Sequence, residues 1–180
     1  MTSYRRNFIP GGTFFFTVNL AERKRSLLTD HIALLREAFR QVRHRHPFTI
    51  DAIVVLPEHL HTIWTMPPGD ADFATRWRLI KTMFSRHLAH DERISLSRSA
   101  KGERGIWQRR YWEHAIRDEL DFERHVNYIH FNPVKHGWVG RTRDWMPSSF
   151  HRYVNLGIYP VDWGCNVFYN SREFGEDEFG

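Results

Sequence analysis

The chain has 180 residues, a length typical of one domain, and its 41% apolar content, with 14 Phe and 7 Trp, excludes a disordered or low-complexity protein. Its single cysteine, Cys165, excludes a disulfide framework and a cysteine-based zinc site. The net charge of +5 rises to +8 without the last ten residues, which hold four acidic side chains and one Arg, so the basic, aromatic-rich body favours a polyanionic partner such as a nucleic acid.

The first half of the chain is predicted to form a strand, a helix and two further strands. Apolar side chains at every second position predict a strand over residues 14–20. Apolar residues at helical spacing then predict a helix from Asp30, as its N-cap, to about His46. Two β-like runs follow, over residues 48–56 and 59–66, and a Pro-Pro-Gly-Asp turn ends the second.

The second half is predicted to add two helices and a strand. A single apolar stripe predicts a helix over residues 72–90, a basic loop covers residues 91–105, and a short strand covers residues 112–117. A last helix over residues 118–132 has to end before Pro133, because proline disfavours helical geometry in the residue that precedes it. The element order predicts an α+β fold, with helices packed on an antiparallel or mixed sheet.

A pair of histidines opens the third predicted strand. His59 and His61 are two positions apart, so both imidazoles point to the same face and can reach one metal ion. Two imidazoles leave coordination positions open for a phosphate oxygen. The alternative is two surface histidines at a strand edge.

One polar face of the last predicted helix holds a second set of candidate catalytic side chains. Asp121, His125, Tyr128 and Asn132 fall at i, i+4, i+7 and i+11. A phenol has an ordinary pKa near 10, so it attacks phosphorus poorly unless a cation or a base assists it. A metal site next to Tyr128 would meet that need. The alternative is an amphipathic tyrosine at the flank of a helix.

Aromatic and basic side chains alternate over residues 107–114. Aromatic rings of this kind can stack on unpaired bases while Arg and Gln contact base edges, and the preceding basic loop can neutralise phosphates. In the alternative interpretation the tryptophans belong to the core and the arginines are solvated.

Three strings taken together carry a resemblance to a known family. They are Val54–His61, then Trp107-Gln108 with Trp112–Arg117, and then Tyr128–Val139. In this order they resemble the REP-associated tyrosine transposases, bacterial relatives of the single-tyrosine HUH transposases of small insertion sequences. The likeness extends over nearly the whole chain.

The resemblance implies a function and a set of site residues. It implies a ferredoxin-like or RRM-like HUH domain that acts as an endonuclease and strand transferase on single-stranded and hairpin DNA of repetitive extragenic palindromes. Tyr128 would be the catalytic nucleophile, forming a 5′-phosphotyrosine link. His59 and His61 would hold a divalent metal, Mg²⁺ or Mn²⁺, and Asn132 takes the place of a third polar ligand, often Gln in relatives.

The domain bounds, the cellular setting and the DNA-binding side chains can also be predicted. Residues 1–165 are expected to form one domain and residues 166–180 an acidic tail, in a monomer or homodimer at the nucleoid of a bacterial cytoplasm, with no membrane partner. The DNA-binding candidates are basic, aromatic or amide side chains: Arg5, Arg6, Arg78, Lys81, Arg98, Lys101, Arg104, Trp107, Gln108 and Arg110.

Two other functions remain open at this point. A module that binds hairpin DNA and regulates without cutting would have the same basic body. A phosphoesterase that uses water would cleave DNA without becoming linked to it.

Overall fold

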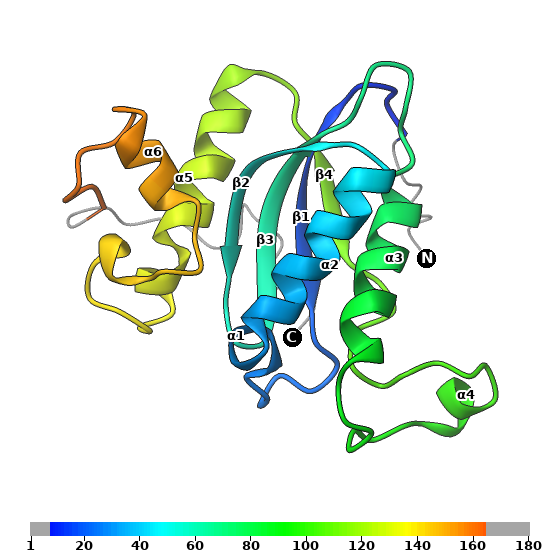
Figure 1. The fold of residues 1–180 in the computed structure, drawn as a ribbon. Coiled ribbons are helices and arrows are strands. Elements are labelled where there is room, and N and C mark those ends of the chain that lie inside the picture. Colours follow the sequence, from blue (N-terminus) through cyan, green and yellow to red (C-terminus); the bar gives the residue numbers. More distant parts are fainter. Residues whose placement is uncertain (1–7, 165–180) are drawn as a thin grey trace, which may run out of the picture.

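The computed structural model describes residues 8–164 and confirms the predicted α+β fold (Figure 1). The predicted tail over residues 166–180, and the DNA-binding candidates Arg5 and Arg6, lie outside the described residues. Four strands form one antiparallel sheet in the order β2-β3-β1-β4, with β1 at Thr13–Asn19, β2 at Thr49–Val55, β3 at His59–Thr65 and β4 at Trp112–Ala115. The strands β2, β3 and β4 each fall within a predicted run, and β1 begins one residue before the run predicted over residues 14–20.

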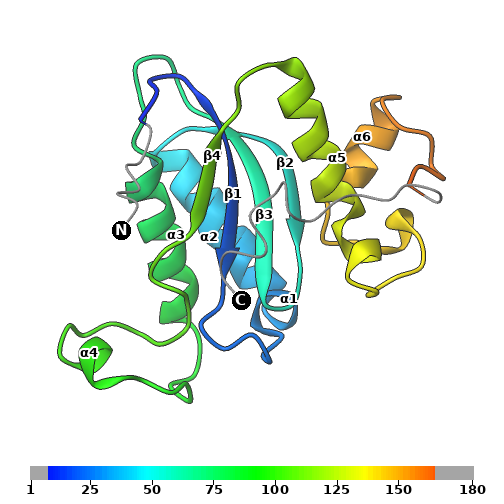
Figure 2. The same cartoon turned by 180° about the vertical axis from the view of Figure 1, so that it is seen from behind.

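Helices lie on both sides of this sheet. Among them, α2 and α3 pack against each other over one face, and α5 lies on the opposite side, as the view from behind shows (Figure 2). The helices are α1 (Leu27–Asp30), α2 (Ile32–Arg45), α3 (Phe73–Arg86), α4 (Leu96–Ser99), α5 (Glu119–Lys135) and α6 (Phe150–Asn155), with a 3₁₀ turn at Thr142–Asp144.

Strand alternation produces two separate cores, one on each face of the sheet. Phe14 and Phe16 of β1 belong to the larger core under α2 and α3, whereas Phe15 between them belongs to the smaller core under α5. In the larger core the indoles of Trp64 and Trp77 stack with ring centroids 4.2 Å apart. Burial of aromatic side chains of this size dominates the stability of such a layer.

Three predictions about the helices before α5 needed correction. Asp30 does not cap α2; it is the last residue of the short helix α1, and the N-cap position of α2 is His31. The segment predicted as a loop contains one helical turn, α4, capped by the Ser95 side chain. Asp72 does cap α3, accepting a hydrogen bond from the Thr75 N–H at 2.9 Å, but α3 ends four residues earlier than predicted.

The largest correction concerns the end of α5, because the helix continues through Pro133 to Lys135. A proline has no N–H, so the helix forgoes one hydrogen bond at this point, but the pattern resumes where His136 N–H donates to the Asn132 carbonyl at 3.0 Å. Asn132 and Pro133 are buried, and packing against the rest of the chain outweighs the local cost of proline. The helix therefore gains a last turn, which carries Lys135.

No helix in residues 8–164 combines the length and the apolar composition that crossing a bilayer requires.

Candidate active site

The paired histidines of β3 share one face of the strand, as their spacing predicts, and this is the face on which α5 lies. Leu60 between them points into the core under α2 and α3, so the strand presents His59 and His61 together on the other face. Their ring centroids are 4.8 Å apart, and both side chains are buried. Two imidazoles this close can serve one metal ion.

Each imidazole is oriented by a hydrogen bond at Nδ1. His59 Nδ1 donates to the Glu58 carboxylate at 3.0 Å, and a hydrogen bond of 2.9 Å joins His61 Nδ1 to the Thr17 hydroxyl. Metal-binding histidines are held in this way in known sites, where the second ring nitrogen bonds an oxygen of the protein. This arrangement favours Nε2 of each ring as the ligating atom.

The environment keeps the His61 ring neutral at neutral pH. Burial is the main cause, and the positive charges of neighbouring groups such as Lys135 add to it, so the pKa of His61 falls well below its usual value. A neutral imidazole is the protonation state that binds a metal.

Tyr128 comes from α5 to the same place. Its side chain is fully buried, and its ring centroid lies 5.3 Å from that of His61. The ammonium group of Lys135 donates to the Tyr128 hydroxyl at 3.4 Å and lies 4.9 Å from the ring centroid. A single chain therefore brings together the tyrosine, the histidine pair and a cation. Asn132 is fully buried on α5, one turn after Tyr128.

Two neighbours of this site were not predicted. Lys135 is one, and the other is His136, whose ring centroid lies 5.3 Å from that of His59. Both follow from helical spacing, since Lys135 is seven residues after Tyr128 and His136 is four after Asn132. The expectation that the helix ends before Pro133 concealed them.

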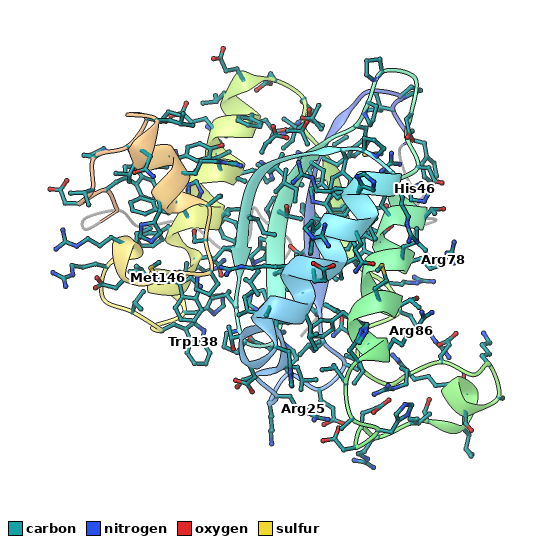
Figure 3. The ribbon with its side chains drawn as sticks, viewed as in Figure 1. Arg25, His46, Arg78, Arg86, Trp138 and Met146 are labelled. Atoms are coloured by element: carbon teal, nitrogen blue, oxygen red, sulfur yellow. The ribbon has the colours of Figure 1, made fainter. Side chains whose placement is uncertain are left out.

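A hollow of about 880 Å³ lies on the side of the sheet opposite α5, between α3 and the segment that leads into β4. Arg78 and Arg86 lie on the side of α3 that faces away from α2 (Figure 3). Six of the predicted DNA-binding side chains line the hollow: Arg78, Lys81, Arg98, Arg104, Trp107 and Gln108. The sequence therefore predicted most of a basic surface that the fold assembles in one place.

Several of these side chains also build the wall of the hollow. Arg98 donates to the carbonyls of Arg104 and Trp107 at 2.8 and 2.9 Å, and Arg104 pairs with Glu92. Trp107 is buried in the core, which fits the alternative interpretation of that tryptophan. Arg78 is exposed, as are Lys101 and Arg110, which lie outside the hollow's lining.

The hollow and the histidine pair approach each other at one end of the sheet. Gln108 N–H donates to the Asn19 carbonyl at 3.0 Å, and Asn19 pairs with His59 across β1 and β3. The Gln108 end of the hollow is thus close to the end of the sheet where His59 lies.

Comparison with known proteins gives several matches. A family model described as transposase IS200 like matches residues 15–132. The chain is 51% identical over 167 residues to the REP-associated tyrosine transposase of Escherichia coli (strain K12), covering 93% of each chain. A Haemophilus influenzae protein is 47% identical over 167 residues, which are 92% of this chain and 95% of that protein. A solved structure of a REP-associated tyrosine transposase bound to a REP hairpin has a TM-score of 0.81 and 50% identity, covering 95% of this chain and 96% of that one.

Proposed function

Because the chain belongs to the IS200-like transposase family, whose members cleave DNA, we propose that it acts as a single-stranded DNA endonuclease and strand transferase with Tyr128 as its nucleophile. One observation carries this proposal. The buried Tyr128 hydroxyl has the Lys135 ammonium at 3.4 Å, and the Tyr128 ring lies 5.3 Å from a neutral histidine of a strand-borne pair. An activated phenol beside a candidate metal site is what attack on a phosphodiester requires.

The proposed substrate is a hairpin formed by a repetitive extragenic palindrome. The solved relative at 50% identity is bound to a REP hairpin, and the E. coli relative is REP-associated. The basic hollow next to α3 offers positive side chains for the backbone of such a hairpin. Its position at the His59 end of the sheet supports passage of the adjoining single strand to Tyr128.

The donor set fits a divalent cation. His59 and His61 offer imidazole nitrogens, and Asn132 offers an amide oxygen from α5. Family membership supports metal dependence, and Mg²⁺ or Mn²⁺ is the identity that we propose. Such a cation, when bound, withdraws charge from the scissile phosphate. Glu58 and Thr17 fix the two imidazoles in the orientation needed to bind it.

The chemical step is a transesterification. The Tyr128 hydroxyl oxygen forms a bond to phosphorus, the bond from phosphorus to the 3′-oxygen of the leaving strand breaks, and the phenolic proton leaves with that oxygen or with water. The product is a 5′-phosphotyrosine link, and the attack of another 3′-hydroxyl on it reverses the step. Strand joining therefore needs no further energy source.

Lys135 stabilises the negative charge that develops on the Tyr128 oxygen during attack and departure. We expect Lys135→Met to slow strand cleavage by roughly 10²- to 10³-fold, the usual loss for one hydrogen-bond donor at a developing charge. Lys135→Arg should retain more activity than Lys135→Met, since it keeps the positive charge. Single-turnover cleavage of a labelled hairpin measures both, with the exposed Lys24→Met as a control. Equal rates for Lys135→Met and the wild type would remove Lys135 from the mechanism.

The basic lining of the hollow predicts how strongly hairpin affinity depends on salt concentration. Arg78 and Arg86 are exposed on α3, and both line the hollow, so replacing both with Ala should weaken hairpin binding and reduce the slope of log K against log[salt] by about 2. Fluorescence anisotropy at several salt concentrations measures the slope. Arg45→Ala, an exposed arginine of α2, is the control. An unchanged slope in the double variant would place the hairpin on a different surface.

We also propose that a monomer is sufficient for strand cleavage, since Tyr128 and the histidine pair meet within one chain. We place the functional domain at residues 1–165 and its site of action at the nucleoid in a bacterial cytoplasm, where the proposed substrate is found.

A further inference from the structure

A second group of metal-ligand side chains lies on the α5 side of the sheet, apart from the His59–His61 pair. His114 projects from the edge strand β4, and Asp121 and His125 follow one turn apart at the start of α5. One ligand atom from each of the three lies within 4.8 Å of the others. The group therefore joins two elements that are neighbours only in the folded chain.

The Asp121 carboxylate is the centre of the group. His114 Nε2 donates to its Oδ2 at 2.8 Å, and His125 Nδ1 lies 3.1 Å from its Oδ1. The Arg117 N–H also donates to Oδ2, at 3.0 Å, which helps to hold the carboxylate in place. The side chains of Asp121 and His125 are only 8% and 6% exposed, whereas His114 is 24% exposed. One side of a largely buried site thus reaches solvent.

The pKa values of Asp121 and His125 both lie below their usual values. Burial alone would raise the pKa of Asp121, but hydrogen bonds from His114 and from Arg117 outweigh it and hold the pKa at about 2. Burial lowers the pKa of His125 below its usual value. At neutral pH the group therefore offers an ionised carboxylate and a neutral imidazole.

The two histidines of the group stack on each other, and Phe15 separates them from the β3 pair. The rings of His114 and His125 are nearly parallel, with centroids 4.8 Å apart. Phe15 lies between the two sites, since its ring centroid is 4.7 Å from that of His125 and 5.6 Å from that of His61. An ion in one site would not share ligands with an ion in the other.

We propose that His114, Asp121 and His125 form a second metal site that binds Zn²⁺ or a similar first-row transition metal. Two imidazoles and one carboxylate are a common protein ligand set for Zn²⁺, with a solvent molecule completing the tetrahedron. The partly exposed His114 gives that solvent molecule access.

Such an ion would tie α5 to the sheet. It would bridge β4 and the first turns of the helix that carries Tyr128, and His125 is three residues, or about 4.5 Å of helical rise, before that tyrosine. The site is therefore proposed to fix the position of the tyrosine helix, and it does not depend on the proposed DNA chemistry.

The test measures Zn²⁺ binding in the absence of DNA. The full chain with His59→Ala and His61→Ala, which removes the β3 pair, is titrated with Zn²⁺ by calorimetry and with Co²⁺ by visible absorption. We expect one ion to bind per chain, and the melting temperature to rise by roughly 5–10 °C at free Zn²⁺ of 100 times Kd. Adding His114→Gln or His125→Gln should abolish the binding, the Co²⁺ spectrum and the shift.

Controls separate this site from other histidines. His44→Gln, an exposed histidine of α2, should leave Zn²⁺ binding unchanged in the same background. His114→Gln changes a partly exposed side chain, so it provides a folded variant if His125→Gln is unstable. Two results would overturn the proposal: no Zn²⁺ binding by the chain with His59→Ala and His61→Ala, or unchanged binding in both Gln variants. Either result would mean that the group is only a carboxylate hydrogen-bonded to two imidazoles. Because the Zn²⁺ titrations contain no DNA, their outcome does not depend on whether the chain cleaves DNA.

Discussion

Tyr128→Phe is expected to abolish the covalent link between protein and DNA while leaving hairpin affinity within about twofold. The substitution removes one oxygen and keeps the ring, which packs against His61 and Phe15. The loss of the hydroxyl and its hydrogen bond from Lys135 should cost only about 1 kcal/mol of stability. Denaturing gels of a hairpin labelled on the 3′ side of the cut measure the adduct, and anisotropy measures the affinity.

A matched control comes from a second tyrosine with a bonded hydroxyl. Tyr153 of α6 donates to the Asp51 carbonyl at 3.1 Å, so Tyr153→Phe removes a comparable group at another place in the fold. It should form the adduct at the wild-type yield. A normal adduct from Tyr128→Phe would refute the nucleophile, and a wild-type chain that binds hairpin but never cuts it with any divalent metal would favour a regulator.

His61→Ala should reduce cleavage at least about 10³-fold, because a metal that stabilises the transition state contributes several kcal/mol. His59→Ala should have a similar effect. His61 is fully buried, so His61→Gln is the second variant, since it keeps most of the side-chain volume and limits the cavity cost. Initial cleavage rates across a range of Mn²⁺ concentrations measure the loss.

The cleavage assay of the histidine variants includes three controls. His44→Ala, on the exposed side of α2, should cleave at the wild-type rate. A chelator should stop cleavage by the wild-type chain, and circular dichroism should show that each variant is folded. Cleavage by His61→Ala at the wild-type rate, or cleavage that survives the chelator, would exclude a metal at the β3 pair.

The sequence predicted those features that depend on local periodicity. Alternation along residues 14–20 predicted β1 and the face that Phe14 and Phe16 bury, and the i, i+2 spacing predicted that His59 and His61 share a face. The three motif strings predicted the family, because their residues and order together are far more specific than any one spacing.

Some features that depend on contacts between distant segments were not predicted. Helical spacing placed Asp121 and His125 on one face, but His114 joins them only because β4 pairs with β1 at the edge of the sheet. In the same way, nothing local shows that the Arg104 guanidinium is occupied by Glu92 and by backbone carbonyls. Charge alone therefore indicated which side chains are basic but not which are available to a ligand.

The end of α5 shows how tertiary packing overrides a local rule. Proline disfavours a helical residue before it, yet the burial of Asn132 and Pro133 keeps the helix intact to Lys135. That last turn brings the Lys135 ammonium to the Tyr128 hydroxyl, at 3.4 Å.

The most direct test of Tyr128 as the nucleophile is mass spectrometry of the protein–DNA adduct. The wild-type chain is incubated with hairpin DNA and Mn²⁺, digested with protease and nuclease, and the modified peptide is sequenced. We expect a 5′-linked nucleotide on the peptide that contains Tyr128, attached at that residue. Cleaved DNA without any linked peptide, or a link to a different side chain, would contradict it.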